Sequence, residues 1–185
     1  GTIGLEILNE MDDLDAVIVP IGGGGLIAGI AFAIKSLRPN VKVYGVQAAG
    51  APSMFRSIQD GQIGTLDSVS TIADGIAVKR PGDLTYEIVS KYVDDIATVT
   101  EDEICAAILK LIEKQKMIAE GAGAVSVAAA MFNKFPIQGK KVVCVISGGN
   151  IDVTSLSRVI NRGLVKSGRT ATLRIELMDK PGMLK

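Results

Sequence analysis

The chain has 185 residues, enough for one domain with its own hydrophobic core and the beginning of a second. Basic and acidic residues number 20 each, which excludes a bulk charge that would attract nucleic acid or an anionic membrane. A small neutral or zwitterionic ligand is expected instead. Tryptophan is absent and aromatic residues make up 4%, so Val, Ile, Leu and Ala are expected to form the core, as is typical of α/β proteins.

Targeting and membrane-spanning segments are absent from the sequence pattern. The first residues, 1–6, contain no initiator methionine and no signal-type apolar core, which predicts that the chain begins within a longer protein. Gly, Pro or charged residues interrupt every apolar run before it reaches the length of a membrane span. Cys105 and Cys144 match no metal or redox spacing and are expected to be buried thiols. A soluble cytoplasmic protein is therefore predicted.

Short aliphatic runs alternate with helical patterns along the first part of the chain. The first buried strand is predicted at 16–21, and it stops at four consecutive glycines, 22–25. A helix follows, and Pro39 marks its end before a second strand at 41–46. Its apolar residues recur at three- and four-residue steps; they are Ile27, Ile30, Ala31, Ile34 and Leu37.

The middle of the chain is less regular. Residues 50–75 are rich in Gly, Ser and Asp, and only a short helix near 54–59 is expected there. Regular patterns resume with a helix at 84–91 and a strand at 96–99.

The last third contains a second strand-turn-helix unit. A T-x-x-E capping box at 100–103 predicts the start of a helix. A further helix at 122–132 is apolar nearly all round and is expected in the interior. A buried strand at 141–146 then ends in Ser-Gly-Gly-Asn, 147–150, and a polar helix is predicted at 152–161. The order predicts an α/β fold with an open, mostly parallel sheet and helices on both faces.

Two glycine-rich turns, 22–25 and 147–150, follow predicted strands. Because ligands bind beyond the carboxyl ends of strands in open parallel sheets, both turns are expected to face one crevice. Consecutive glycines expose amides that can surround an anion, although they also permit a tight turn. Gly23, Gly25 and Ala28 match the loose dinucleotide pattern, but the acidic residue that holds a ribose is missing after the next strand. A phosphate with little else attached is favoured over a nucleotide.

Several segments in one order resemble a known family. The stretch 19–29, followed far downstream by 147–150, resembles the fold-type-II pyridoxal-phosphate enzymes, which have a tryptophan-synthase-β-like fold. Among these, the chain looks like an incomplete threonine dehydratase, also called threonine ammonia-lyase. Further segments that resemble this subfamily are 1–7, 73–75, 93–96, 100–104 and 120–124.

The resemblance implies pyridoxal 5'-phosphate as the cofactor. It implies that the Ser147 hydroxyl bonds the pyridine nitrogen, where a neutral group makes the ring a weaker electron sink than a carboxylate would and suits β-elimination. An ordinary strand-end hydroxyl is the alternative interpretation of Ser147. The amides implied to hold the cofactor phosphate are those of Gly22, Gly23, Gly24, Gly25 and Leu26.

The implied reaction is that of a carbon-nitrogen lyase acting on a small amino-acid substrate. L-threonine or L-serine would lose its Cα proton and β-hydroxyl, giving 2-oxobutanoate or pyruvate plus ammonia. The resemblance places the Schiff-base lysine upstream of these residues, so no catalytic residue is assigned here and the chain alone is predicted to be inactive. The missing N-terminal half and further copies in a homo-oligomer are the expected partners. Alternatives are a serine racemase or other β-eliminating enzyme, a non-catalytic regulatory or assembly fragment, and, more remotely, a nucleotide-binding protein.

Four further residues are candidates for positions beside the cofactor. Glu120 is placed near the ring by the resemblance, or interacts only with the dipole at a helix start. Asp74 and Gly75 border the cofactor or form a common turn pair, and the turn is favoured. Asn150 lines an effector or subunit contact or caps the next helix, and capping is favoured.

One position departs from the serine racemases of this fold, which have acidic metal ligands after the second strand. Gln47 and Ser53, with Ala51 between them, stand at the matching positions. Neither brings the charge that a hard divalent cation prefers, so no metal is expected and a dehydratase is favoured over a racemase.

The C-terminal residues indicate regulation. An alternating strand pattern at 170–177 and a loop at 179–184 resemble the beginning of an ACT domain, which implies an amino-acid effector such as isoleucine or valine for the parent protein. A β-arm used in dimer contacts is the alternative. The predicted division is 1–163 for the cofactor-binding catalytic domain, 164–169 for a linker and 170–185 for the start of an ACT-like domain.

Overall fold

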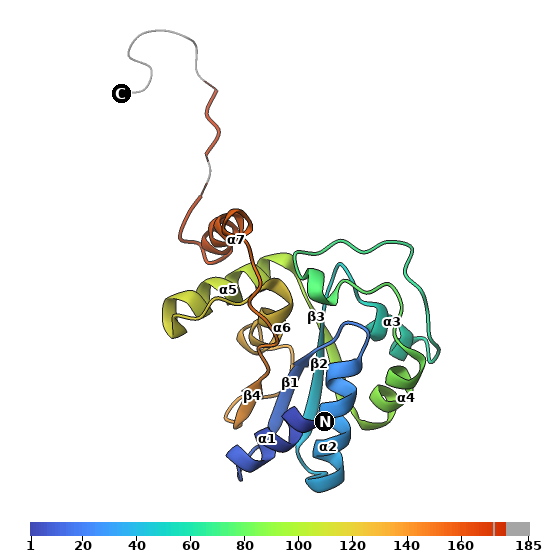
Figure 1. Ribbon diagram of the computed structural model, residues 1–185. Helices are drawn as coiled ribbons and strands as arrows, with labels where there is room; N and C mark the ends of the chain where they lie inside the picture. The colour runs from blue at the N-terminus through green and yellow to red at the C-terminus, as the bar shows by residue number, and fades with distance from the viewer. Residues whose placement is uncertain (172, 177–185) are drawn as a thin grey trace, which may run out of the picture.

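The computed structural model describes residues 1–171 and 173–176. Four parallel strands form one sheet in the order β3-β2-β1-β4. Helices cover both faces of this sheet (Figure 1). The α/β fold with an open parallel sheet predicted from the sequence is therefore confirmed.

The elements follow the predicted order closely. The strands are β1 (Ala16–Pro20), β2 (Lys42–Ala48), β3 (Asp95–Val99) and β4 (Val142–Cys144). The helices are α1 (Thr2–Glu10), α2 (Gly25–Leu37), α3 (Ser53–Gln59), α4 (Asp83–Tyr92), α5 (Glu101–Gln115), α6 (Gly121–Met131) and α7 (Val153–Lys166), with one 3-10 turn, η1 (Asp74–Ile76).

Strand β1 lies at the centre of the fold and sends alternate side chains into two cores. Ala16 and Ile18 belong to the core beneath α5, α6 and α7. Val17 and Val19, together with Ile21 just beyond the end of the strand, belong to the core beneath α1, α2 and α4. All five are nearly or completely buried, as expected for a parallel strand covered on both faces.

The helix ends show where local sequence signals succeed and fail. The capping box is present, because the Thr100 hydroxyl accepts from the Glu103 amide and the Glu103 carboxylate accepts from the Thr100 amide. The periodic apolar residues of α2 are buried except for Leu37, which is 61% exposed. Leu37 is the last residue of its helix, and Arg38 beyond it binds the carbonyl oxygens of Leu8 and Met11 instead.

Helix α1 has no counterpart among the predicted elements. Its Gly4 and Leu8 are buried against α2. A nine-residue helix containing glycine and two isoleucines has little intrinsic stability in water, so packing against α2 stabilises it.

The described C-terminal residues comprise helix α7 and a segment without regular structure. Helix α7 continues to Lys166 and therefore includes the first residues of the predicted linker, 164–169. Residues 170–171 and 173–176 have no assigned helix or strand, and the predicted ACT loop at 179–184 lies outside the described residues. None of the described helices is both long enough and apolar enough to cross a membrane.

Candidate functional site

The strand order reverses its direction at β1. Strands β2 and β3 lie on one side of it, and β4 lies on the other. Such a switch point opens a crevice beyond the carboxyl ends of the two strands that flank it. The glycine turn, residues 22–26, follows β1, and the serine turn, residues 147–150, follows β4. Because β1 and β4 are parallel neighbours, both turns emerge at the same edge of the sheet.

A cavity of about 320 Å³ lies between these two turns. All six residues predicted to bind the cofactor line it, as do Gly75 and Glu120. Asp74 and Asn150 do not; they line a second cavity of about 320 Å³, which also has Glu120 in its wall. The cofactor-binding residues are thus brought together, while two of the four additional candidates lie elsewhere.

The glycine turn has one position at which only glycine fits. Gly24 has φ of 97°, in the left-handed region that L side chains rarely adopt. A Cβ there would lie 2.7 Å from Met54 Cε and 2.8 Å from Thr85 Oγ1. Gly23 and Gly25, by contrast, have no atom within 4 Å of the Cβ position. Their missing side chains leave open space beside the cavity.

The backbone amides of the glycine turn are unpaired. Within residues 1–171 and 173–176, no acceptor bonds the N–H groups of Gly22, Gly23 or Gly24. The first turn of α2, beginning at Gly25, leaves further N–H groups free and adds partial positive charge. These donors, beside open space in a cavity wall, fit a phosphate monoester.

The serine turn is held by α6. The buried Ser126 hydroxyl donates to the Val145 carbonyl oxygen at 2.7 Å. The Glu120 amide donates to the Gly148 carbonyl oxygen at 3.2 Å, and the Glu120 carboxylate fills the space that a Cβ on Gly148 would need. Ser147 itself is exposed, and its hydroxyl bonds no group in the described part of the chain. That hydroxyl is therefore available to a ligand.

Glu120 occupies the wall between the two turns. It is the N-cap residue of α6, but its side chain makes no capping hydrogen bond. A Cβ on Gly75 would lie 3.4 Å from its Oε1 atom, so the carboxylate faces the loop that borders the cavity. A position beside the cavity and a position at the start of a helix were the two interpretations of Glu120. Both describe its location, because the start of α6 is itself part of the cavity wall.

Asp74 and Asn150 have different local roles. Asp74 begins η1 and its Oδ1 accepts from the Gly75 amide at 2.9 Å, in agreement with the favoured turn. Helix α7 is capped by Asp152, whose carboxylate accepts from the Ser155 amide at 2.9 Å. The prediction that Asn150 caps this helix is therefore wrong. Asn150 and Asp152 both have side chains that can cap a helix, and α7 begins directly after Asp152.

Two polar residues that support the glycine turn were not assigned this role from the sequence. Gln47 is fully buried, and its amide group donates to the Ile21 carbonyl oxygen at 3.2 Å and accepts from the Phe55 amide at 2.8 Å. Thr85 contacts the turn directly through the Gly23 carbonyl oxygen at 2.5 Å. Gln47 could have been recognised from the sequence, because an isolated polar residue near the end of a buried strand indicates a buried hydrogen-bonding role. No local pattern connects Thr85 with a turn 62 residues away.

Comparison with known proteins identifies the family. Residues 1–148 match the family model described as pyridoxal-phosphate dependent enzyme. The chain belongs to this family. The cofactor that the resemblance implied, pyridoxal 5'-phosphate, is the one on which this family depends.

Individual relatives agree with the predicted subfamily. The chain is 56% identical to L-threonine ammonia-lyase of Thermotoga maritima over 185 residues, all of this chain and 46% of the relative. The processed form of threonine deaminase isoform 2 from Solanum lycopersicum superposes with a TM-score of 0.82 at 38% identity, covering 87% of this chain and 45% of that one. Maize serine racemase has a TM-score of 0.79 at 36% identity, covering 87% and 52%. The chain thus spans about half the length of these relatives.

Proposed function

We propose that this chain forms part of a pyridoxal-phosphate-dependent L-threonine/L-serine ammonia-lyase that produces 2-oxobutanoate or pyruvate and ammonia. One observation carries the proposal: the glycine turn and Ser147 line a single cavity at the switch point of the sheet. The names of the threonine ammonia-lyase and threonine deaminase relatives support the substrate class. Serine racemase is the alternative, supported by the maize structure.

Each end of the cavity has a proposed role. The amides of Gly22, Gly23, Gly24, Gly25 and Leu26 bind the cofactor phosphate, and the Ser147 hydroxyl bonds the pyridine nitrogen. When bound, the cofactor supplies an electron-withdrawing ring that stabilises negative charge at the substrate Cα. A neutral hydroxyl cannot keep the ring nitrogen protonated as a carboxylate would. Ser147 therefore favours elimination, in which the charge departs with the β-hydroxyl, over a reaction that needs a long-lived carbanion.

The reactive amine is proposed to come from outside these residues. No lysine lines the cavity in the described part of the chain. We therefore place the Schiff-base lysine in the part of the relatives' length that this chain does not span. The other half of the protein and a homo-oligomeric assembly remain proposed partners, and residues 170–185 remain proposed as the start of an ACT-like domain.

The test uses the full-length protein that contains this chain. Ser147→Ala is expected to lower keto-acid formation about tenfold, because one hydrogen bond to the ring nitrogen is lost. Ser147→Asp is expected to lower it on the order of a hundredfold, because the added carboxylate changes the protonation of the ring. Ser90→Ala is the matched control, because that exposed hydroxyl bonds only its own helix at the Tyr86 carbonyl oxygen.

Product analysis separates the alternatives. L-threonine and L-serine are supplied in turn, and 2-oxobutanoate, pyruvate and D-serine are quantified. Keto acids as the main products support the lyase. D-serine as the main product would replace it with the racemase. The 185-residue chain alone, with added cofactor, is expected to form neither keto acid, and clear turnover by it would overturn the external position of the lysine.

A further inference from the structure

One carbonyl group in the glycine turn is held from outside the cavity. The Thr85 hydroxyl donates to the Gly23 carbonyl oxygen at 2.5 Å, and the Gly82 amide donates to the same oxygen at 3.2 Å. Both donors come from the start of α4, which packs beside α2. Two independent hydrogen bonds therefore fix the direction of this carbonyl.

The fixed carbonyl also determines where the next amide points. The carbonyl of Gly23 and the N–H of Gly24 belong to one planar trans peptide, so they point in opposite directions. Because the oxygen points toward α4, the Gly24 N–H points away from α4. That N–H has no acceptor within the described residues, and both glycines line the cavity. The contact with Thr85 thus orients a free donor of the proposed phosphate site.

A run of four glycines needs such an external restraint. Glycine adopts positive and negative φ about equally well, so a peptide between two glycines can turn over at low cost. An anion site binds tightly only when its donors are oriented before the anion arrives. In this turn the side chains of Thr85 and Met54 also pack against Gly24. The restraint comes from α4 because the glycines have no side chains of their own.

A purely helical role for Thr85 is the competing explanation. Its Oγ1 atom also lies 3.0 Å from the Gly82 carbonyl oxygen, a contact within the first turn of α4. A hydroxyl has one proton, and the contact with Gly23 is shorter by 0.5 Å, the difference between 3.0 and 2.5 Å. The geometry therefore favours donation to the glycine turn.

We propose that Thr85 is a positioning residue for the phosphate end of the cofactor, acting through the peptide between Gly23 and Gly24 without touching the cofactor. The proposal deepens the proposed function and rests on its assignment of the glycine turn. It predicts that the contribution of the Thr85 hydroxyl depends on the phosphate. The affinity for a ligand with the same ring but no phosphate should then not change when the Thr85 hydroxyl is removed.

The experiment measures cofactor affinity in the full-length apoprotein. Thr85→Val removes the hydroxyl at nearly constant shape, Thr85→Ser retains it, and Ser90→Ala removes a hydroxyl from the opposite end of α4. Dissociation constants for pyridoxal 5'-phosphate and for pyridoxal are obtained by absorbance titration. Thr85→Val is expected to weaken binding of the phosphorylated form about tenfold and that of pyridoxal less than twofold. Thr85→Ser and Ser90→Ala are expected to bind both ligands as the unaltered protein does.

Each outcome separates the two proposals. Equal weakening of both ligands by Thr85→Val, with a matching drop in the melting temperature of the apoprotein, would show a structural role and overturn the inference. Unchanged affinity for the phosphorylated form would also overturn it. A phosphate-dependent loss in a protein that forms no keto acid would support the positioning role and remove the proposed activity.

Discussion

The glycine turn and the serine turn bound the same cavity, but they are supported in different ways. The first follows a central strand that is paired on both sides, and its Gly23 carbonyl is held by α4. The second follows β4, which among the described residues pairs only with β1, and Ser147 is exposed. The end of the cavity proposed to bind phosphate is therefore preformed within this chain, whereas the end proposed to contact the ring depends mainly on α6. A site can anchor its ligand rigidly at one end and remain adjustable at the other.

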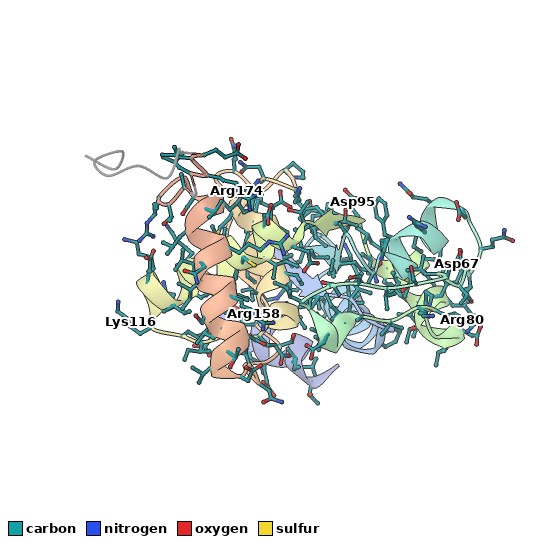
Figure 2. All side chains as sticks on the ribbon, turned by 90° about the horizontal axis from the view of Figure 1, so that it is seen from above. Asp67, Arg80, Asp95, Lys116, Arg158 and Arg174 are labelled. Atoms are coloured by element: carbon teal, nitrogen blue, oxygen red, sulfur yellow. The ribbon has the colours of Figure 1, made fainter. Side chains whose placement is uncertain are left out.

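Figure 2 shows the two sides of the molecule. Helix α7, which carries Arg158, runs along one side of the molecule. Asp67 and Arg80 lie at the far end, on the long connection before α4. That connection is braced within itself, because the Leu66 amide donates to the Lys79 carbonyl oxygen, and it is fixed to the rest of the fold where the Ser70 amide donates to the Gly50 carbonyl oxygen. Irregular structure near the glycine turn is thus well restrained.

The largest effect is expected from a methyl group placed inside the glycine turn. Gly24→Ala should reduce the free energy of unfolding by about 3 kcal/mol, because φ of 97° disfavours any L side chain and the methyl would overlap Met54 and Thr85. Urea unfolding of the full-length apoprotein measures this. Gly25→Ala is the control, since nothing lies within 4 Å of its Cβ position and alanine favours the helix that begins there. Similar losses in both variants would contradict a preformed turn.

A second effect is expected from the ion pairs at the amino ends of β2 and β3, the edge of the sheet opposite the glycine turn. The Asp94 carboxylate contacts Lys35 Nζ at 2.6 Å, Lys42 Nζ at 2.8 Å and the Val43 amide at 2.8 Å. Burial alone raises the pKa of Asp94, but these three donors together outweigh burial and lower it. Asp94→Asn should cost about 2 kcal/mol of unfolding free energy at pH 7, because half-buried Lys35 loses its anionic partner and keeps only backbone carbonyl acceptors.

The pH dependence of this effect has a defined sign. A carboxyl whose pKa is lowered in the folded protein stabilises it above the ordinary value of 3.8 and loses that contribution as the pH falls through the folded pKa. The difference in unfolding free energy between Asp94→Asn and the unaltered protein should therefore begin to shrink as the pH falls below about 5. It should continue to shrink below about pH 4. Asp60→Asn, at an exposed carboxylate, is the control. A pH-independent difference would attribute the loss to packing alone.

A smaller and local effect is expected at the serine turn. Ser126→Ala removes the hydroxyl that bonds the Val145 carbonyl oxygen and should cost about 1 kcal/mol. Hydrogen exchange is expected to accelerate at 145–150 and to stay unchanged at 22–26, because only the serine turn depends on this contact. Mass spectrometry of peptides from the two turns reports the difference, with Ser90→Ala as control. Acceleration at both turns would show that they are not independently supported.

The smallest effect concerns the two thiols. Burial raises the pKa of Cys105 and of Cys144 to about 11. At pH 8 about one thiol in a thousand is then ionised, so alkylation by iodoacetamide should be slow for both. Cys105 is buried as predicted, but Cys144 is only half-buried because β4 lies at the edge of the sheet. Cys144 should therefore react a few times faster, as followed by mass spectrometry with Cys144→Ser as control. Faster reaction of Cys105 would contradict the greater exposure of Cys144.

Local chemistry explains how much of this structure could be predicted. The capping box at 100–103 and the break at 22–25 are encoded by adjacent residues, and they appear where predicted. Helix α1 was missed and the cap of α7 was misplaced. The first depends on contact with α2, and the second on which of two nearby polar residues the backbone path brings to the helix start. Neither contact is contained in a short stretch of sequence.

The sequence alone determined that buried strands alternate with helices. It also determined that one strand ends in a run of glycines and another in a turn that begins with a serine. Periodicity and turn residues act over a few neighbours, so they can be recognised without knowing the rest of the fold. Only the tertiary structure placed β4 beside β1 and thereby opened one cavity between the two turns. It also brought Thr85 to the carbonyl of Gly23. Strand order and such distant contacts follow from the packing of the whole chain, because pairing and burial are decided between segments that no local pattern connects.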